Sequence, residues 1–464
     1  MIQPFHVFKN EFERLVLTLI EKKCSSLLKP FYLRSEAFLH LVYTNYFSEY
    51  DAYAPSGIDS DRPTFIHVIE SQDISKINQE IEKYSGFVGF PNKELHLIVV
   101  PISYHRDEFY SNPFYPPKRV EVWGKEKIDE LAREFPVDYA SLRYYETVIN
   151  PKRRIGFGIP REVPSPSVDS FKKNNLDLAK ELKNKMAHNK ISLVLGSGVS
   201  MPYNSKMDWD KLVNSLYDLL DDNYKFSEEG RERAFKLIGF DNLSKSQYVK
   251  MMLKDNYIAA LYETIYKGFN KKLLTYKTSL YSCAELISKT NSIKKVITYN
   301  YDDFLELLLK ERNIPFNPMF SINSSLNNDL PIYHVHGYLP KNSEKLSAKE
   351  KRARCEELVL TEDEYFKCYS NSMNWQVAIQ LMTFKDDCCL LVGNSVTDFH
   401  EKKILHETIG LGTNRKSRFA IIPMNDLGEN DLLKIYSYFE NELGVRIIWA
   451  DSIVDISNKI DSLA

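Results

Sequence analysis

Four polar segments, each directly after an apolar run, hold the residues of this chain whose types could do chemistry. They combine glycines, hydroxyls, a carboxamide, an imidazole and carboxylates. Glycines and hydroxyls suit phosphate binding, and the other groups suit hydrogen bonding and proton transfer at a sugar. The segments hold Gly196, Ser197, Gly198 and Ser200 after ISLVL; Thr298, Asn300 and Asp302 after KKVI; His336 after IYHV; and Gly393, Ser395 and Asp398 after CCLLV.

The first segment has the pattern of a strand, a glycine turn and a helix. Gly196 and Gly198 lack a Cβ, so a backbone there can approach a dinucleotide pyrophosphate closely. A helix-like segment follows from Trp209, and its unpaired N–H groups would attract an anion. Glycine pairs after strands are common, so this segment gains its meaning from the other three.

The four segments are expected to meet, because the carboxyl ends of parallel strands lie at one edge of a sheet. Each also has a simpler interpretation. Asn300 and Asp302 could form an Asx turn and a helix cap, His336 could be a satisfied histidine at a strand end, and Gly393 with Ser395 could form an ordinary tight turn. One shared site explains all four segments together, whereas the simpler interpretations require four separate coincidences.

Taken together, GSGVS, TYNYD, HVHG and GNSVTD resemble the sirtuin-like NAD-consuming domains, especially those of bacterial anti-phage defence. The resemblance covers about 175–464. It includes several further matches with the family's pattern, although the second position of the glycine turn is Ser197 where that family usually has Ala. These matches are Pro202, Trp209 and Leu212; Tyr301, Leu305 and Glu306; Val359, Leu360, Thr361 and Tyr365.

The resemblance implies that NAD is a substrate, cleaved to nicotinamide and ADP-ribose, and that no metal is required. Protein-deacylating sirtuins carry a zinc ribbon with two C-x-x-C pairs, and none of the six cysteines here forms such a pair. Deacylation is therefore not expected. Whether the ADP-ribose would be linear or cyclised stays open.

The resemblance also implies a role for each residue. Asn300 would bind the ribose region and the attacking water, His336 would accept a proton while neutral near pH 7, and Asp302 would orient the site. His334 would face the same side of its strand as His336 and is the alternative proton acceptor. The remaining residues would bind the substrate: Gly196, Gly198 and Ser200 at the pyrophosphate, Gly393 and Ser395 near the adenosine, and Ser197, Thr298 and Asp398 elsewhere in the site.

The elements that must position these residues form an α/β chain of two domains. Residues 166–464 alternate apolar strands with helices, which predicts a Rossmann-like, mainly parallel sheet with helices on both faces and a helical insertion at about 205–290. Residues 1–165 predict a smaller α/β domain. The boundary near 165 falls in the segment 150–170, where four prolines oppose a long helix or a central strand.

The first domain faintly resembles restriction-endonuclease-like folds. Asp59 and Glu70 could be metal ligands there, but the lysine of the usual Glu-x-Lys pattern is missing. A degenerate nuclease-like fold used for interaction, or an unrelated α/β interaction or regulatory domain, fits better. The aromatic-rich segment 104–119 is either a contact surface or a loop packed on its own domain.

Composition limits the classes of partner and the cellular location that the sequence supports. A net charge of −2 gives no general attraction for nucleic acid or an anionic membrane, so a nucleic-acid-directed role through the first domain is open but unsupported. No apolar run of eighteen residues and no secretory signal are evident, which predicts a cytoplasmic protein with reduced thiols. A defence NADase would need control, so we expect a homo-oligomer and an activating protein partner or a phage-derived trigger. An NAD or ADP-ribose sensor without turnover is the alternative.

Overall fold

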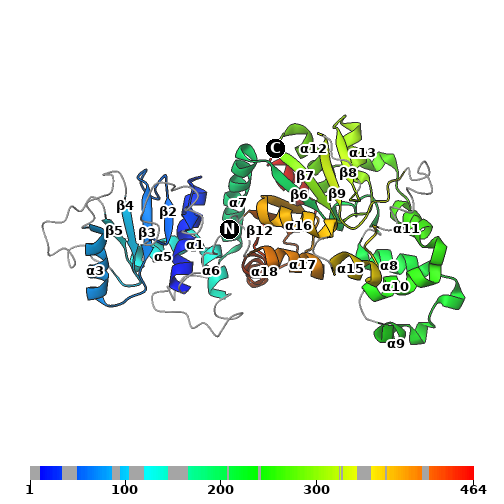
Figure 1. Cartoon of the computed structure of the whole chain (residues 1–464), viewed down its shortest axis with the longest axis horizontal. Coiled ribbons are helices and arrows are strands. Elements are labelled where there is room, and N and C mark those ends of the chain that lie inside the picture. The colour runs from blue at the N-terminus through cyan, green and yellow to red at the C-terminus, as the bar shows by residue number, and fades with distance from the viewer. Residues whose placement is uncertain are drawn as a thin grey trace. The chain divides into compact units, whose positions relative to one another are not determined.

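The computed structural model describes two compact units of this chain (Figure 1). The first unit consists of Met1–Asn184 and Asp426–Glu442, and the second of Lys185–Asn425 and Leu443–Ala464. The segments 104–119 and 145–165, which contain the expected contact loop and the expected domain boundary, lie outside the described residues. The described residues are 11–33, 50–85, 95–103, 120–144, 166–205, 208–238, 242–322, 324, 328–341, 357–370, 374–409 and 417–464.

The second unit is built on a seven-stranded parallel sheet with the order β12-β11-β10-β6-β7-β9-β8. From β6 the chain moves outward through β7 to β9, and later returns to the other side of β6 to build β10, β11 and β12. The sheet therefore has a topological switch point between β6 and β10, where open α/β sheets bind ligands. The strands are β6 (Ile191–Leu195), β7 (Ile293–Thr298), β8 (Phe316–Met319), β9 (Leu330–His334), β10 (Cys389–Val392), β11 (Arg418–Pro423) and β12 (Val445–Ala450).

The central strands are buried along their whole length, as β6 and β10 show. Continuous apolar runs such as ISLVL suit this position, because helices cover both faces of a parallel sheet. This confirms the predicted Rossmann-like fold with flanking helices. The flanking helices form two packed groups: α12 (Ser279–Lys289), α13 (Phe304–Glu311) and α19 (Asp455–Asp461); and α15 (Glu362–Tyr369), α16 (Trp375–Asp386) and α17 (Phe399–Ile409).

Arg418 stabilises the amino end of β11 without any carboxylate. Its buried guanidinium donates all five hydrogens, to the carbonyl oxygens of Phe384, Leu405 and Leu443 and to the hydroxyl of Thr408. Phe384, Leu405 and Thr408 lie in the last turns of α16 and α17, where unpaired carbonyls carry partial negative charge. The cation is therefore neutralised by helix ends.

A helical insertion separates β6 from β7, as the sequence predicts. Its first helix begins at Asp208, whose side chain caps the backbone N–H of Lys211 at 3.3 Å. The helices share a core that includes Leu216 and Leu261 and also packs on Tyr301, which follows β7. They are α8 (Trp209–Asp218), α9 (Glu228–Ile238), α10 (Asn242–Leu253) and α11 (Tyr257–Tyr266), followed by α12.

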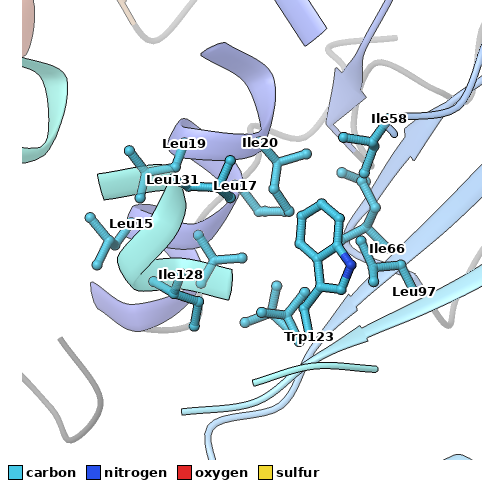
Figure 2. Close-up of a cluster of buried hydrophobic side chains, with 14 of the residues drawn as sticks. Leu15, Leu17, Leu19, Ile20, Ile58, Ile66, Leu97, Trp123, Ile128 and Leu131 are labelled. Atoms are coloured by element: carbon cyan, nitrogen blue, oxygen red, sulfur yellow. The ribbon is translucent and has the colours of Figure 1, made fainter. Parts of the chain in front are cut away.

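The first unit holds a separate, smaller sheet with the order β1-β2-β3-β4-β5. The strands β1 to β3 pair antiparallel, and β3 to β5 pair parallel. Trp123 belongs to its main apolar core and lies between the sheet and the helices that carry Leu17 and Leu131 (Figure 2). The elements of this unit are α1 (Glu11–Ser26), β1 (Tyr32–Leu33), β2 (Ala52–Ala54), β3 (Thr64–Val68), α3 (Ile74–Ser85), β4 (Leu95–Val99), β5 (Val120–Trp123), α5 (Lys125–Glu134), α6 (Pro136–Tyr144) and α18 (Glu429–Glu442), with α7 (Val168–His188) reaching into the second unit.

Some details differ from the sequence-based expectation. The residues LVLT at 358–361 have the sequence pattern of a strand but form none, and Val359 donates its N–H to the His336 carbonyl at 3.0 Å. The edge strand β8 and the short strands β1 and β2 were not foreseen. The sequence pattern indicates a helical stretch at about 9–48, but α1 ends at Ser26 and β1 follows it, and residues 34–49 lie outside the described residues. Within the described residues, no helix combines the length and apolarity needed to cross a membrane.

Candidate functional site

The four polar segments leave four neighbouring strands at the same edge of the sheet. Leu195 pairs with Val392 on one side and with Thr298 on the other, and Thr298 pairs with His334. The segments after β10, β6, β7 and β9 therefore start side by side, on both sides of the switch point. This is the arrangement that the sequence predicts, and the remaining question is which side chains meet within it.

The glycines allow the segments after β6 and β10 to pack on each other. Gly198 donates its N–H to the Gly393 carbonyl at 2.9 Å, and a Cβ on Gly196 would lie 2.5 Å from that same oxygen. Gly393 has a φ of +63°, and a Cβ there would lie 2.5 Å from the Val199 nitrogen. The resemblance assigns Gly196 and Gly198 to pyrophosphate binding and Gly393 to the adenosine side. The structure shows a second reason for glycine at these positions, because a Cβ would prevent the two segments from packing together. The Gly198 N–H is already used in a hydrogen bond within the protein.

The carboxamide of Asn300 joins the end of β7 to the glycine turn. Its Nδ2 donates to the Gly196 carbonyl at 3.1 Å and to Ser200 Oγ at 2.9 Å. A carbonyl only accepts, so this contact fixes which amide atom is the nitrogen. Thr298 Oγ1 accepts the backbone N–H of Asn300 at 3.1 Å. Both Nδ2 hydrogens are used, whereas Oδ1 accepts no hydrogen bond from the described residues and can accept one from a ligand.

His336 is buried among aromatic rings and is 6% exposed. Its Nε2 lies 3.1 Å from the hydroxyl of Tyr369, and its ring meets those of Tyr299 and Tyr365 edge to face, at 5.0 and 5.6 Å between centroids. Burial lowers the pKa of His336 from 6.5 to about 4. The imidazole is therefore neutral at pH 7, as expected, but it is a weaker proton acceptor than an ordinary histidine.

The pKa of Asp302 is shifted in the opposite direction to that of His336. Burial raises the pKa of Asp302 from 3.8 to about 7, and that of its neighbour Asp303 to about 6. Asp302 Oδ1 accepts the backbone N–H of Phe304 at 3.1 Å, and a side-chain interaction with Ser200 lowers the pKa and so offsets part of the effect of burial. A general base works best with a pKa near the working pH. Asp302 meets that condition better than His336, which the sequence analysis had not foreseen.

Asp398 connects the segment after β10 to the rings around His336. It caps α17 by accepting the backbone N–H groups of His400 and Glu401 at 2.8 and 3.0 Å, and it accepts the Tyr365 hydroxyl at 2.7 Å. The ring of His400 in turn stacks on that of Tyr369 at 4.0 Å. Tyr369 and His400 were missed in the sequence analysis. Tyr365 and Tyr369 are four residues apart on α15, so they lie on one helix face. This spacing was the sequence signal that could have identified Tyr369.

The segment after β10 also contains a strained residue. Val396 is buried and has a φ of +50°, a region that β-branched residues rarely adopt. The Asn394 side chain holds the turn by accepting the Val396 N–H at 2.8 Å and by donating to the Glu401 carboxyl. Burial raises the pKa of Glu401 to about 8. Ser395 is exposed, and its hydroxyl lies 2.8 Å from that of Thr397.

The sequence-predicted residues thus fall into two adjoining groups. The Asn300 carboxamide contacts Gly196 and Ser200 of the glycine turn, Thr298 accepts the backbone N–H of Asn300, and Asp302 lies two residues further along the chain. His336 belongs to a second group, the aromatic group, which Asp398 contacts through the Tyr365 hydroxyl. The aromatic group consists of the rings of Tyr299, His336, Tyr365, Tyr369 and His400. In the described part of the chain no hydrogen bond joins the Asn300 carboxamide to the His336 ring. Ser197 and Ser395 are exposed at the surface of their turns.

The candidate ligands of the first unit, Asp59 and Glu70, have different surroundings. Asp59 forms an ion pair with Lys127 at 3.0 Å, and Glu70 is exposed beyond the end of β3. Across all residues that the structure describes, no group of three or more histidine, cysteine, aspartate or glutamate side chains is arranged to hold a metal ion.

Comparison with known families agrees with the geometry of the second unit. Residues 294–448 match the family model of the SIR2-like domain. This part of the chain is sirtuin-like. The match includes Asn300, Asp302, His336 and Gly393, while the glycine turn after β6 precedes it. A comparison with curated proteins finds no match to the chain.

Proposed function

We propose that this protein is an NAD glycohydrolase that cleaves NAD to nicotinamide and ADP-ribose. The SIR2-like family uses NAD, and the matched region contains most of the candidate site. The observation that carries the proposal is the Asn300 carboxamide, which is locked at the switch point with Oδ1 open. The arrangement suits a dinucleotide whose ribose lies against this oxygen.

The proposed chemistry requires little acid assistance, because nicotinamide leaves NAD as a neutral molecule from a cationic ring. The barrier lies in forming a ribose with oxocarbenium character and in placing a water against it. Asn300 Oδ1 would accept a hydrogen bond from a ribose hydroxyl or from that water. Asp302 or His336 would accept the proton, and the pKa of Asp302 suits this task near neutral pH.

The charges around the aromatic group support the same chemistry. Burial keeps His336 neutral at pH 7 and raises the pKa values of Tyr365 and Tyr369 well above 10, so these rings carry no charge. The Asp398 carboxylate makes no ion pair with the described residues, so the group has negative character. Such surroundings favour a cationic nicotinamide ring and a cation-like transition state.

We also propose that the enzyme depletes NAD as an effector of anti-phage defence in the cytoplasm. Uncontrolled NAD loss would harm its own cell, so a separate unit is well suited to regulation. The first unit would receive an activating protein or a phage-derived trigger, or would mediate homo-oligomer formation.

The direct test is to incubate the purified protein with NAD and to quantify nicotinamide and ADP-ribose by chromatography and mass spectrometry. Asn300→Ala is expected to lower kcat roughly a hundredfold or more, as for the loss of a positioning group. His336→Ala is expected to have an effect of the same order. Asn223→Ala, which changes an exposed asparagine of the helical insertion, is the matched control. Near-normal turnover by folded Asn300→Ala would contradict the proposed site.

One observation favours a second function, in which the site binds NAD or ADP-ribose as a sensor without turnover. The burial of His336 and its low pKa weaken it as a base. A sensor would bind ADP-ribose in calorimetry yet release no nicotinamide from NAD, also in the presence of phage lysate. The same assays therefore separate the two functions.

A further inference from the structure

A buried pair of side chains lies directly behind Asn300. His334 is 1% exposed and contacts Glu306, which is 4% exposed, with 2.6 Å between His334 Nε2 and Glu306 Oε1. The other ring nitrogen, Nδ1, lies 3.1 Å from the main-chain carbonyl oxygen of Asn300. The Tyr338 ring covers the imidazole at 4.2 Å between centroids. A chain of contacts thus runs from α13 through β9 to the residue that follows β7.

The chemistry of these partners fixes the proton on Nδ1. A carbonyl oxygen can only accept, so His334 Nδ1 must carry a hydrogen and donate it to Asn300. One further proton is then shared between Nε2 and Glu306, whether as an imidazolium with a carboxylate or as a neutral ring with a protonated acid. In both forms Glu306 selects the Nδ1–H state, because it occupies the other nitrogen.

We propose that Glu306 and His334 form a positioning pair that fixes the backbone of Asn300 and so aims its carboxamide. The residue is then held at three points: its N–H by Thr298, its carbonyl by His334, and its Nδ2 by Gly196 and Ser200. The inference rests on the proposed function to the extent that Asn300 contacts NAD. It also explains why His334 is not the proton acceptor, since both of its ring nitrogens are occupied and it is sealed from solvent.

The pair lies in a group of buried acids. Burial and, to a smaller extent, the nearby Glu306 side chain raise the pKa values of Asp302 and Asp303. An imidazolium form of His334 would offset the charge of the Glu306 carboxylate that it contacts. Positioning and charge compensation are therefore two separable roles, and variants can distinguish them.

The first experiment measures kcat and KM for NAD hydrolysis in paired variants. Glu306→Leu and His334→Leu remove the contacts and are expected to lower kcat about thirtyfold or more while KM changes less than about threefold. Glu306→Gln can still pair with a neutral Nδ1–H imidazole, and His334→Asn can still donate to the Asn300 carbonyl. Both are expected to stay within about fivefold of the wild-type kcat.

Glu285→Leu is the control, because it breaks another Glu contact, with Arg312 at 2.9 Å, away from the site. It is expected to retain the wild-type kcat. Wild-type turnover by the two leucine variants would overturn the proposal. Equal losses in Glu306→Gln and Glu306→Leu would also overturn it, because they would show that the charge of Glu306 matters rather than its hydrogen bond.

The second experiment does not depend on turnover. In protein labelled with ¹⁵N-histidine, NMR is expected to show a slowly exchanging Nδ1–H signal that disappears in His334→Asn and persists in Glu306→Gln. A wild-type His334 protonated only at Nε2 would refute the pair whatever the activity. If the Nδ1–H is present but NAD is not hydrolysed, the proposed function fails and the pair stands. ADP-ribose affinity in the leucine variants then tests whether the pair shapes the site.

Discussion

Replacing Asp302 by asparagine should change how the stability of the second unit depends on pH. Burial raises the pKa of Asp302 from 3.8 to about 7, so the folded protein binds this proton more tightly than the unfolded chain does. The stability contributed by the protonated acid is complete below pH 3.8 and is lost as the pH rises through 7. Asparagine is nearly isosteric, can still accept the Phe304 N–H, and carries no charge at any pH.

The size of the effect follows from the two pKa values. Between about pH 5 and about pH 8.5, ionisation of Asp302 lowers the free energy of unfolding by at most about 3 kcal/mol. Asp302→Asn should therefore gain up to about 3 kcal/mol relative to the wild type over this interval. The comparison between two pH values cancels any constant effect of the substitution on packing.

The assay is urea unfolding followed by tryptophan fluorescence. Trp123 lies in the first unit, whereas Trp209, Trp375 and Trp449 lie in the second. Trp123→Phe in both backgrounds therefore makes the signal specific to the second unit. Asp387→Asn is the control: burial raises its pKa, but hydrogen bonds from Lys294, Ser192 and Lys295 lower it below the ordinary value overall, so it stays ionised at both pH values. A stability difference between Asp302→Asn and wild type that does not vary with pH would refute the reasoning.

Two further substitutions test the packing around the site. Gly393→Ala should destabilise the second unit by about 3 kcal/mol or more, because its φ is positive and its Cβ would meet the Val199 nitrogen. Gly268→Ala is the control, because Gly268 lies in the same unit and has a positive φ of +76° but open space around it, and equal urea midpoints for the two variants would contradict the packing argument. Arg418→Met should cost about 3 kcal/mol in the same assay, because several buried carbonyls lose their donors, and a loss below about 1 kcal/mol would show that water or neighbours replace them.

The sequence predicts the sheet well because burial on both faces demands continuous apolar runs. ISLVL and CCLLV stand out for this reason, and the polar residues after them mark the edge where ligands bind. Edge elements are harder to predict. The strand β8 contains Pro318, which removes a backbone donor and hides the strand from pattern reasoning.

The contacts within the site were less predictable than its location. The sequence shows that Asn300 and His336 follow neighbouring strands, but the direction of each side chain depends on partners remote in sequence, such as Ser200 and Tyr369. The pKa values of Asp302 and His336 depend on burial, which residue types alone do not reveal. The contact between Glu306 and His334 depends on the packing of α13 near β9, which the sequence alone does not show.

The two ends of the parallel strands respond to acid and alkali in different ranges. At the amino end, burial lowers the pKa of Arg418 only to about 10, and the pKa of Asp387 lies below 3.8, so both stay charged around neutrality. At the carboxyl end, Asp303, Asp302 and Glu401 change charge at about 6, 7 and 8. A modest change in pH near neutrality would thus alter the charge of the loops that hold Asn300, whereas the charges at the opposite edge of the sheet would stay constant.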